Sequence, residues 1–124
     1  MPVITTDQAA VFELDGVRFT GLASPERGST ESSVWHVRLT SAEPGPPHTL
    51  DHEEVLVALS GTAVATLGAE DHHVTPGAAI VVPPGTPFAL RCAGSEPFEA
   101  VSVLPVGATA CYEGGEPFTP PWTA

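Results

Sequence analysis

Three features of the sequence predict an all-β domain, an antiparallel barrel or sandwich. Short apolar runs recur along the chain at fairly even spacing, as strands do and long helices do not. The 12 glycines and 14 prolines fall largely between these runs, where they mark turns. No segment combines a helical apolar stripe with helix start and stop signals. The pattern is therefore that of short strands joined by tight connections.

The apolar runs give the expected strands and the Gly/Pro clusters give the turns. The strands are 11–19, 34–40, 55–59, 63–67, 78–82, 88–92 and 98–104. The turns are 43–47, 60–61, 68–71, 76–77, 83–87 and 93–97, with His72 and His73 expected beside a hairpin turn. In the second strand, Trp35 and Val37 alternate with His36 and Arg38. That alternation indicates a strand with one buried and one solvent-facing side.

The stretch 55–67 differs, because it is apolar on both faces. Val55 and Val57 lie on one face of the expected strand, and Leu56 and Ala58 lie on the other. A strand that faced water on one side would carry polar residues at alternate positions. We therefore expect another strand or an identical subunit to cover the outer side, and we predict a homodimer.

The length of 124 residues fits one domain with its own core and does not fit two. We expect a single domain over residues 1–124, with its core at roughly 30–105 and a Pro-rich C-terminal surface arm at 113–124. No signal peptide or membrane-spanning apolar stretch is recognisable, so a cytoplasmic location is expected. Cys92 and Cys111 are then expected to be free thiols, with their redox state left open.

The charge balance bounds the partners. The net charge is −11, with 4 Lys and Arg residues against 15 Asp and Glu residues. Phosphate backbones are bound mainly through Lys and Arg, so a nucleic-acid partner is not expected. An anionic membrane surface is disfavoured for the same reason. A small molecule is the expected partner, together with a second copy of the chain.

Two segments carry glycine, proline and polar residues at the spacing of a known motif pair. PHTLDHEEVLVALSG covers residues 47–61, and GAAIVVPPGTPFALRC covers residues 77–92. They resemble the paired motifs of the cupin superfamily, G-x5-H-x-H-x3-4-E-x6-G and G-x5-P-x-G-x2-H-x3-N. The matching residues are His48, Glu54, Gly61, Gly77, Pro83 and Gly85. The resemblance implies a double-stranded β-helix (jelly-roll) barrel, often dimeric, with a ligand cavity at one mouth.

The chain departs from the cupin pattern at two metal-ligand positions. In metal-bearing cupins, three histidines and one glutamate hold Fe, Mn, Zn, Ni or Cu. Leu50 and Phe88 stand at two of the histidine positions here. We therefore expect no cofactor. The alternative is a divalent transition metal held by His48, Glu54 and His52, although a solvated His52 is the preferred interpretation.

If the barrel is cupin-like, His48 and Glu54 form the polar spot of the cavity and are the candidate catalytic residues. An imidazole beside a desolvated carboxyl group is suited to proton transfer. The expected apolar wall consists of Leu50, Leu56, Phe88, Leu90 and Val101. Such a wall suits an apolar or aromatic ligand, unless these side chains collapse and fill the barrel.

Three functions follow from this site. The leading hypothesis is a small-molecule-binding cupin, with possible non-redox isomerase, cyclase or lyase chemistry by the His/Glu pair. The second is a metal-dependent cupin enzyme with a reduced ligand set, an oxygenase or a polyketide-cyclase-like enzyme. The third is a non-catalytic ligand-binding or sensor protein. The sequence leaves open whether the protein is an enzyme and which ligand it takes.

Overall fold

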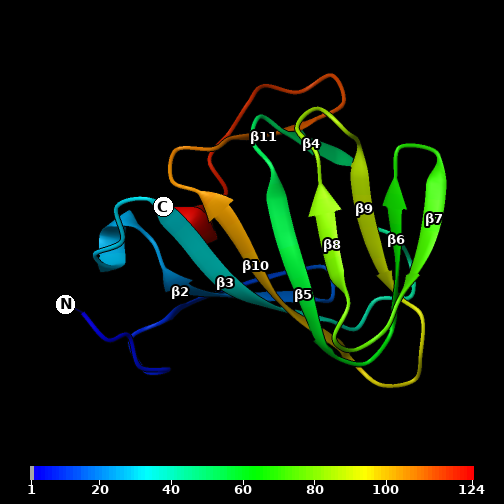
Figure 1. Cartoon of the computed structure of the whole chain (residues 1–124), viewed down its shortest axis with the longest axis horizontal. Coiled ribbons are helices and arrows are strands. Elements are labelled where there is room, and N and C mark those ends of the chain that lie inside the picture. Colours follow the sequence, from blue (N-terminus) through cyan, green and yellow to red (C-terminus); the bar gives the residue numbers. More distant parts are fainter. Residues whose placement is uncertain (1) are drawn as a thin grey trace.

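Two antiparallel sheets face each other in the computed structural model, which describes residues 2–124 (Figure 1). In spatial order, one sheet contains β1 (Ala10–Leu14), β2 (Val17–Ala23), β3 (Ser32–Leu39), β10 (Phe98–Pro105), β5 (Glu54–Ser60) and β8 (Ala79–Val82). The other contains β11 (Ala110–Tyr112), β4 (His48–Leu50), β9 (Phe88–Cys92), β6 (Ala63–Leu67) and β7 (Glu70–Val74). The predicted all-β fold is confirmed, and the arrangement is a double-stranded β-helix barrel.

Helical structure in the described residues is limited to two short 3₁₀ turns. They are η1 (Pro25–Arg27) and η2 (Pro121–Thr123). A helix with the length and hydropathy that a membrane crossing requires is absent from residues 2–124. Cys92 and Cys111 are both free thiols.

The core lies between the inward faces of the two sheets. On β3, Trp35, Val37 and Leu39 are buried, while His36 and Arg38 face outward as the alternation predicted. His36 lies 3.3 Å from Glu99 of the neighbouring strand β10 on that outer face. Because side chains alternate along each strand, one face of every core strand is committed to the interior.

The expected strand 11–19 is a hairpin, so that prediction was wrong. Asp15 and Gly16 form the turn between β1 and β2, with φ angles of 42° and 83°. Two successive positive φ values are the geometry of a two-residue hairpin turn, for which Asp-Gly is a favoured sequence. The Asp-Gly dipeptide indicates the turn, but the apolar residues on both sides of it suggested one continuous strand.

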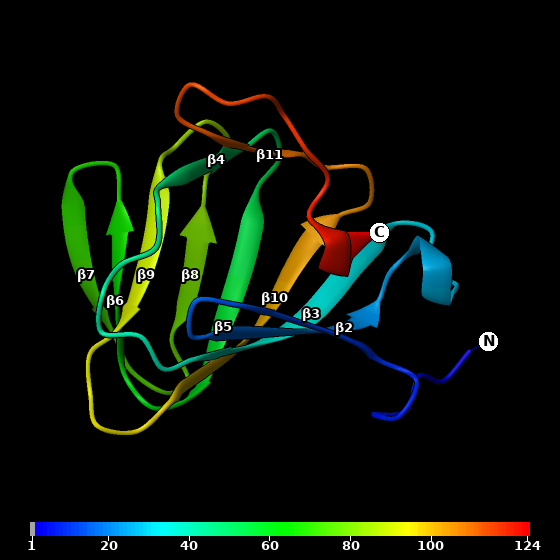
Figure 2. The same cartoon turned by 180° about the vertical axis from the view of Figure 1, so that it is seen from behind.

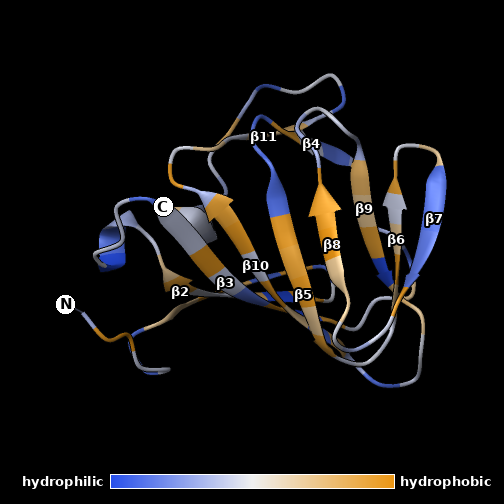
Figure 3. Ribbon diagram, in the orientation of Figure 1, coloured by the Kyte–Doolittle hydropathy of each residue, from blue (hydrophilic) through white to orange (hydrophobic). Residues whose placement is uncertain are grey.

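Three further strands were not expected. β4 and β11 are very short, with three residues each. β7 is polar and exposed over most of its length, so it has no apolar run, and Figure 3 shows it as hydrophilic. His72 and His73 lie within β7, paired with β6, and not in a turn. Charged and polar residues on such an edge strand protect it from pairing with another chain.

The two-sided apolar stretch 55–67 is divided between the sheets. Gly61 turns the chain from β5 into β6, which pair with different neighbours. In β6, Val64 is buried by this chain alone. In β5, Val57 and Leu59 remain exposed on the outer side of the sheet, at 39% and 51%. The chain therefore buries the β6 part of this stretch by itself, whereas the outer side of β5 remains exposed.

The turn at Gly61 gives a test of this packing. Gly61 has φ 72°, and a Cβ there would lie 2.2 Å from the carbonyl oxygen of Pro97. Gly68 has a similar φ of 62°, but a Cβ there would meet nothing within 4 Å. We expect Gly68→Ala to cost about 1–2 kcal/mol of unfolding free energy through backbone strain alone. Gly61→Ala should cost about 3 kcal/mol or more, since backbone must also move.

Urea denaturation of the two variants beside the parent protein measures this difference. Equal destabilisation by the two substitutions would contradict the close approach of the turn after β5 to the segment that precedes β10.

Candidate functional site

A cavity of about 630 Å³ lies inside the barrel, between the two sheets. This volume is within the range of small-molecule sites. Four of the five expected wall residues line it, namely Leu50, Leu56, Phe88 and Leu90. The expectation for Val101 is corrected by the strand register. Val101 pairs with His36 and Val57, which face outward, so Ala100 and Ser102 on either side of it are the residues that point inward.

Glu54 begins β5 and points into the cavity. It pairs with Val82 of β8, and only 4% of the residue is exposed to solvent. Within residues 2–124, nothing donates a hydrogen bond to its carboxyl group and no cation pairs with it. Burial therefore raises the pKa of Glu54 to about 8. The carboxyl group is protonated at neutral pH, and it can donate a hydrogen bond or a proton.

His48 lies on the opposite wall, at the start of β4. Its neighbours in the sheet are Phe88 of β9 and Tyr112 of β11. Its ring meets both aromatic rings edge to face, with centroid separations of 5.7 Å and 6.2 Å. Burial lowers the pKa of His48, while a hydrogen bond with the backbone of Pro46 acts in the opposite direction with a smaller effect. The imidazole is therefore neutral at pH 7, and it can accept a proton.

His48 and Glu54 line the same cavity but come from different sheets. They make no ion pair with each other in the described part of the chain. The dominant influence on each pKa is burial, which favours the neutral form of both groups. The site thus combines an uncharged acid and an uncharged base on facing walls.

The structure does not support His52 as a third metal donor. His52 is exposed, and its Nδ1 lies 2.9 Å from Asp51 in the loop that follows β4, away from the cavity lining. Within residues 2–124, no three His, Cys, Asp or Glu side chains gather closely enough to hold a metal ion. With Leu50 and Phe88 at the other ligand positions, the described interior of the cavity offers His48 and Glu54 as donors, fewer than metal sites normally use, and Asp15 and Glu43 at its opening complete no cluster of three with them. The donor set therefore does not fit the metal that cupins often carry.

The C-terminal arm, residues 113–124, forms part of the cavity wall and was not expected to do so. It crosses the open end of the barrel after β11, as Figure 2 shows. Trp122 stacks on Phe19 of β2, with a centroid separation of 3.7 Å and an angle of 2° between the rings. Phe118 stacks on Tyr112 at 5.4 Å. These aromatic contacts hold the arm against the barrel, because burying large aromatic side chains is favourable.

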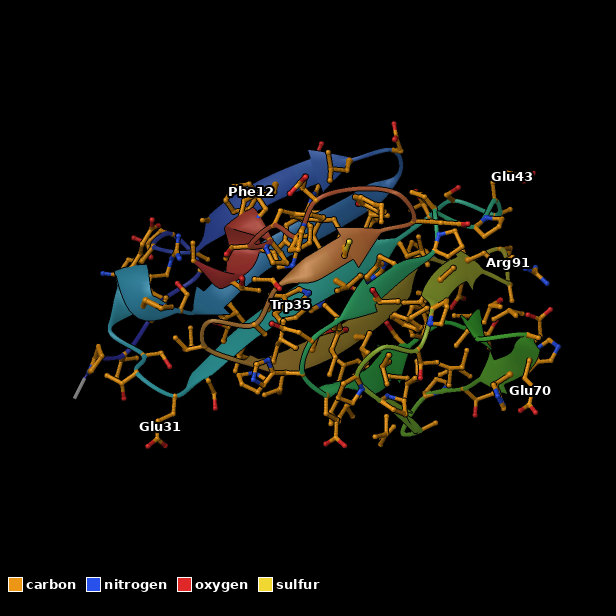
Figure 4. All side chains as sticks on the ribbon, turned by 90° about the horizontal axis from the view of Figure 1, so that it is seen from above. Phe12, Glu31, Trp35, Glu43, Glu70 and Arg91 are labelled. Atoms are coloured by element: carbon orange, nitrogen blue, oxygen red, sulfur yellow. The ribbon has the colours of Figure 1, made fainter. Side chains whose placement is uncertain are left out.

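A buried hydrogen bond also fixes the arm. The Ser33 hydroxyl on β3 donates to the carbonyl oxygen of Thr123 over 2.8 Å. Both residues are buried. Phe12 of β1, the cross-strand partner of Phe19, meets the Trp122 ring edge to face at 6.3 Å, and Figure 4 shows Phe12 beside the C-terminal turn. Trp122 therefore packs on the β1–β2 hairpin through both phenylalanines, and the arm lines one side of the cavity.

Ser102 and several aromatic residues are site residues that the sequence reasoning missed. Trp35, Tyr112, Phe118 and Trp122 line the cavity together with Ser102. The alternation of β10 could have shown that Ser102 points inward, because the buried Ala100 precedes it by two residues. The positions of Phe118 and Trp122 depend on the path of the arm, which carries no strand pattern.

Comparison with known proteins supports the fold. Residues 35–104 match a family model described as a cupin domain. No curated protein matches the sequence. The polyketide cyclase RemF from Streptomyces resistomycificus has a similar structure, with a TM-score of 0.77 and 17% identity over 87% of this chain and 81% of that chain.

Two further solved structures are also similar. KdgF from Halomonas sp. gives a TM-score of 0.69 with 18% identity, covering 83% of this chain and 93% of that one. The S161A mutant of oxalate decarboxylase OxdC from Bacillus subtilis gives 0.75 with 16% identity, covering 86% of this chain and 30% of that one. At these identities the similarity shows the fold alone.

The buried carboxyl group of Glu54 makes stability depend on pH. In the unfolded chain Glu54 ionises near its ordinary pKa of 4.5, whereas in the folded chain it stays neutral until about pH 8. Between these values the folded state holds the extra proton, so its unfolding free energy falls as pH rises. The slope approaches about 1.4 kcal/mol per pH unit and levels off above the folded pKa. We expect Glu54→Gln to gain stability relative to the parent over this range.

Chemical denaturation from pH 5 to pH 8 tests this expectation. Glu53→Gln is the matched control, because Glu53 is the exposed neighbour of Glu54. Its stability should follow the parent protein at every pH. Parallel curves for Glu54→Gln and the parent would show that Glu54 is ionised in the folded state, contrary to the burial argument.

Proposed function

Because the chain belongs to the cupin domain family, we propose that its barrel binds a small apolar or aromatic molecule and transfers a proton on it without redox chemistry. The observation that carries the proposal is the pairing of two neutral titratable groups across an apolar cavity. Glu54 is an acid that keeps its proton at pH 7, and His48 is a base that is free to take one. General acid–base catalysis needs both forms at the working pH.

The composition of the wall supports an aromatic ligand. Of the five Phe, two Trp and one Tyr in the chain, six line the cavity: Phe19, Trp35, Phe88, Tyr112, Phe118 and Trp122. The remaining lining is largely aliphatic, with Leu50, Leu56 and Leu90 among its members. Aromatic side chains bind other rings by stacked and edge-to-face contact, in addition to excluding water. A planar ring system gains most from such a wall.

The chemistry follows from the facing walls. His48 removes a proton from an acidic C–H or O–H bond of the bound molecule, and Glu54 donates its proton to the oxygen where negative charge develops. Glu54 then takes back the proton of the resulting enol, and His48 returns its proton to a different carbon, so both residues are restored and the substrate is isomerised. The resemblance of the fold to that of a polyketide cyclase is consistent with this class of reaction. The metal-dependent alternative gains no support from the donor set, because no three such side chains gather within residues 2–124.

Deuterium exchange on an aromatic ketone tests the proposal. In 2-tetralone, the C–H bonds beside the carbonyl group are acidic, and the rest of the molecule is apolar. We expect the parent protein to accelerate exchange of these hydrogens in D₂O above the buffer rate, as followed by proton NMR. His48→Ala should reduce the enzymatic rate by about 10²-fold or more, since an acid–base group contributes about that much. Glu54→Gln should reduce it as well, whereas Glu53→Gln should not.

The possible outcomes separate the proposed enzyme from a non-catalytic binder. Saturable binding of 2-tetralone without exchange would identify a binding or sensor protein and would contradict the catalytic part of the proposal. Exchange that survives His48→Ala would contradict the assigned base.

The outer face of the larger sheet supports a homodimer, which we include in the proposal. Val57, Leu59, Val81 and Val103 lie on β5, β8 and β10 with exposures of 39%, 51%, 50% and 37%. Figure 3 shows these adjacent strands as largely apolar. Each chain carries a net charge of −11, so two copies repel each other overall. An uncharged face such as this one is where they can associate at the lowest electrostatic cost. A second copy of the chain is therefore the occupant that we propose for this face.

Sedimentation equilibrium tests the assembly. The parent protein should be dimeric at roughly tens of micromolar, because an assembly populated by mass action depends on concentration in this way. Val81→Asp should dissociate it by placing a like charge from each copy at the interface. Val11→Asp is the matched control, since Val11 is equally exposed on β1 at 56% but lies at the other end of the sheet. A monomeric parent, or dissociation by Val11→Asp alone, would contradict this interface.

A further inference from the structure

Ser102 carries a buried hydroxyl group that the protein itself does not satisfy. The residue is fully buried in the middle of β10 and lines the cavity. Its Oγ is closed off from solvent and has no hydrogen-bond partner within residues 2–124. An unpaired buried hydroxyl is costly, since it has lost water without gaining a protein partner. Because Ser102 lines the cavity, a polar group of a bound molecule is the candidate partner for this oxygen.

The strand register places Ser102 on the same wall as Glu54. Ser102 pairs with Leu56 of β5, and Glu54 precedes Leu56 by two residues on the inward face. The two polar groups are therefore diagonal neighbours on adjacent strands, with Cα atoms about 7–8 Å apart in such an arrangement. His48 projects from the opposite sheet. A ring bound between the sheets can meet Ser102 and Glu54 at one edge and His48 at the other.

The charges around the cavity exclude an anionic ligand. The chain has four arginines and no lysine, and none of Arg18, Arg27, Arg38 and Arg91 lines the cavity. Arg18 is instead paired with Glu13 at 2.8 Å on the surface, and Arg91 projects outward at the edge of the molecule in Figure 4. The charged residues that do line the opening, Asp15 and Glu43, are acidic and exposed. A carboxylate or phosphate would find like charge on entry and no counter-charge inside.

From this geometry, and resting on the proposed function, we propose that the cavity selects uncharged aromatic molecules that carry a hydroxyl or carbonyl oxygen. Ser102 is the specificity-determining residue that binds this oxygen. The neutral forms of His48 and Glu54 agree with this choice, because neither offers a full charge to an ion. Ser102 does not take part in the proton transfer. Its part is to orient the oxygen beside Glu54, so that the ring lies against the aromatic wall.

Three naphthyl compounds separate the contributions at pH 7. Naphthalene presents the ring alone, 2-naphthol adds a neutral hydroxyl group, and 2-naphthoate adds a carboxylate. Equilibrium dialysis, read from the absorbance of the ring, gives the three affinities. The parent protein should bind 2-naphthol about two- to tenfold more tightly than naphthalene, the value of one hydrogen bond. It should bind 2-naphthoate at least about tenfold more weakly than 2-naphthol.

Ser102→Ala identifies the group responsible. The variant should lose about two- to tenfold in affinity for 2-naphthol while retaining its affinity for naphthalene. Ser102→Thr keeps a hydroxyl group and should restore the preference at least in part. Unchanged naphthalene binding also shows that the variant is folded and that its cavity is intact. The substitution removes one oxygen atom, so gross disruption of the barrel is not expected.

The results distinguish failure of this inference from failure of the proposed function. If naphthalene itself does not bind the parent protein, the aromatic cavity and the inference built on it both fail. If naphthalene binds but Ser102→Ala leaves the preference for 2-naphthol unchanged, the assignment of Ser102 is wrong while the cavity stands. Equal affinities for 2-naphthoate and 2-naphthol would overturn the selection against anions.

Discussion

The site depends on one constraint, the burial of the Glu54 carboxyl group in an apolar cavity where the described residues 2–124 supply no basic partner. A charged carboxylate there would have to give up its hydration with nothing in return. The group keeps its proton instead, and burial raises its pKa to about 8. The same environment keeps His48 neutral on the opposite wall. The polar part of the site is therefore set by desolvation, in a place where many related barrels hold a metal ion.

That constraint requires a wall that excludes water, and the fold supplies it from distant parts of the sequence. The two sheets provide the inward-facing leucines and Phe88. The C-terminal arm closes the side that the strands leave open, with Trp122 stacked on Phe19. The arm thus contributes to the electrostatics of the site as well as to its shape, because a wetter cavity would let Glu54 ionise at a lower pH. The docking of the C-terminal arm therefore affects the chemistry of the site, because the arm is part of the wall that keeps water from Glu54.

The sequence predicted those parts of the site that follow from strand alternation. His48 and Leu50, Glu54 and Leu56, and Phe88 and Leu90 are each two residues apart, and each pair reaches the cavity because side chains alternate with a period of two.

The same rule explains the errors and omissions. Val101 was placed inside although it is out of phase with Ser102, so a shift of one residue moved it to the wrong face. His52 follows the end of β4, where Asp51 binds it in a loop and alternation no longer applies. The wall contributed by Phe118 and Trp122 depends on tertiary contacts, which local patterns do not encode.

A carbon-13 NMR titration of the side-chain carboxyl groups tests the central claim most directly. The carboxyl carbon shifts when the group ionises, and Glu54→Gln identifies which resonance belongs to Glu54. We expect a midpoint of about 8 for that resonance, well above the ordinary glutamate value of 4.5. A Glu54 resonance with a midpoint near 4.5 would show that the carboxyl group is hydrated or paired, and would contradict the central role of its burial.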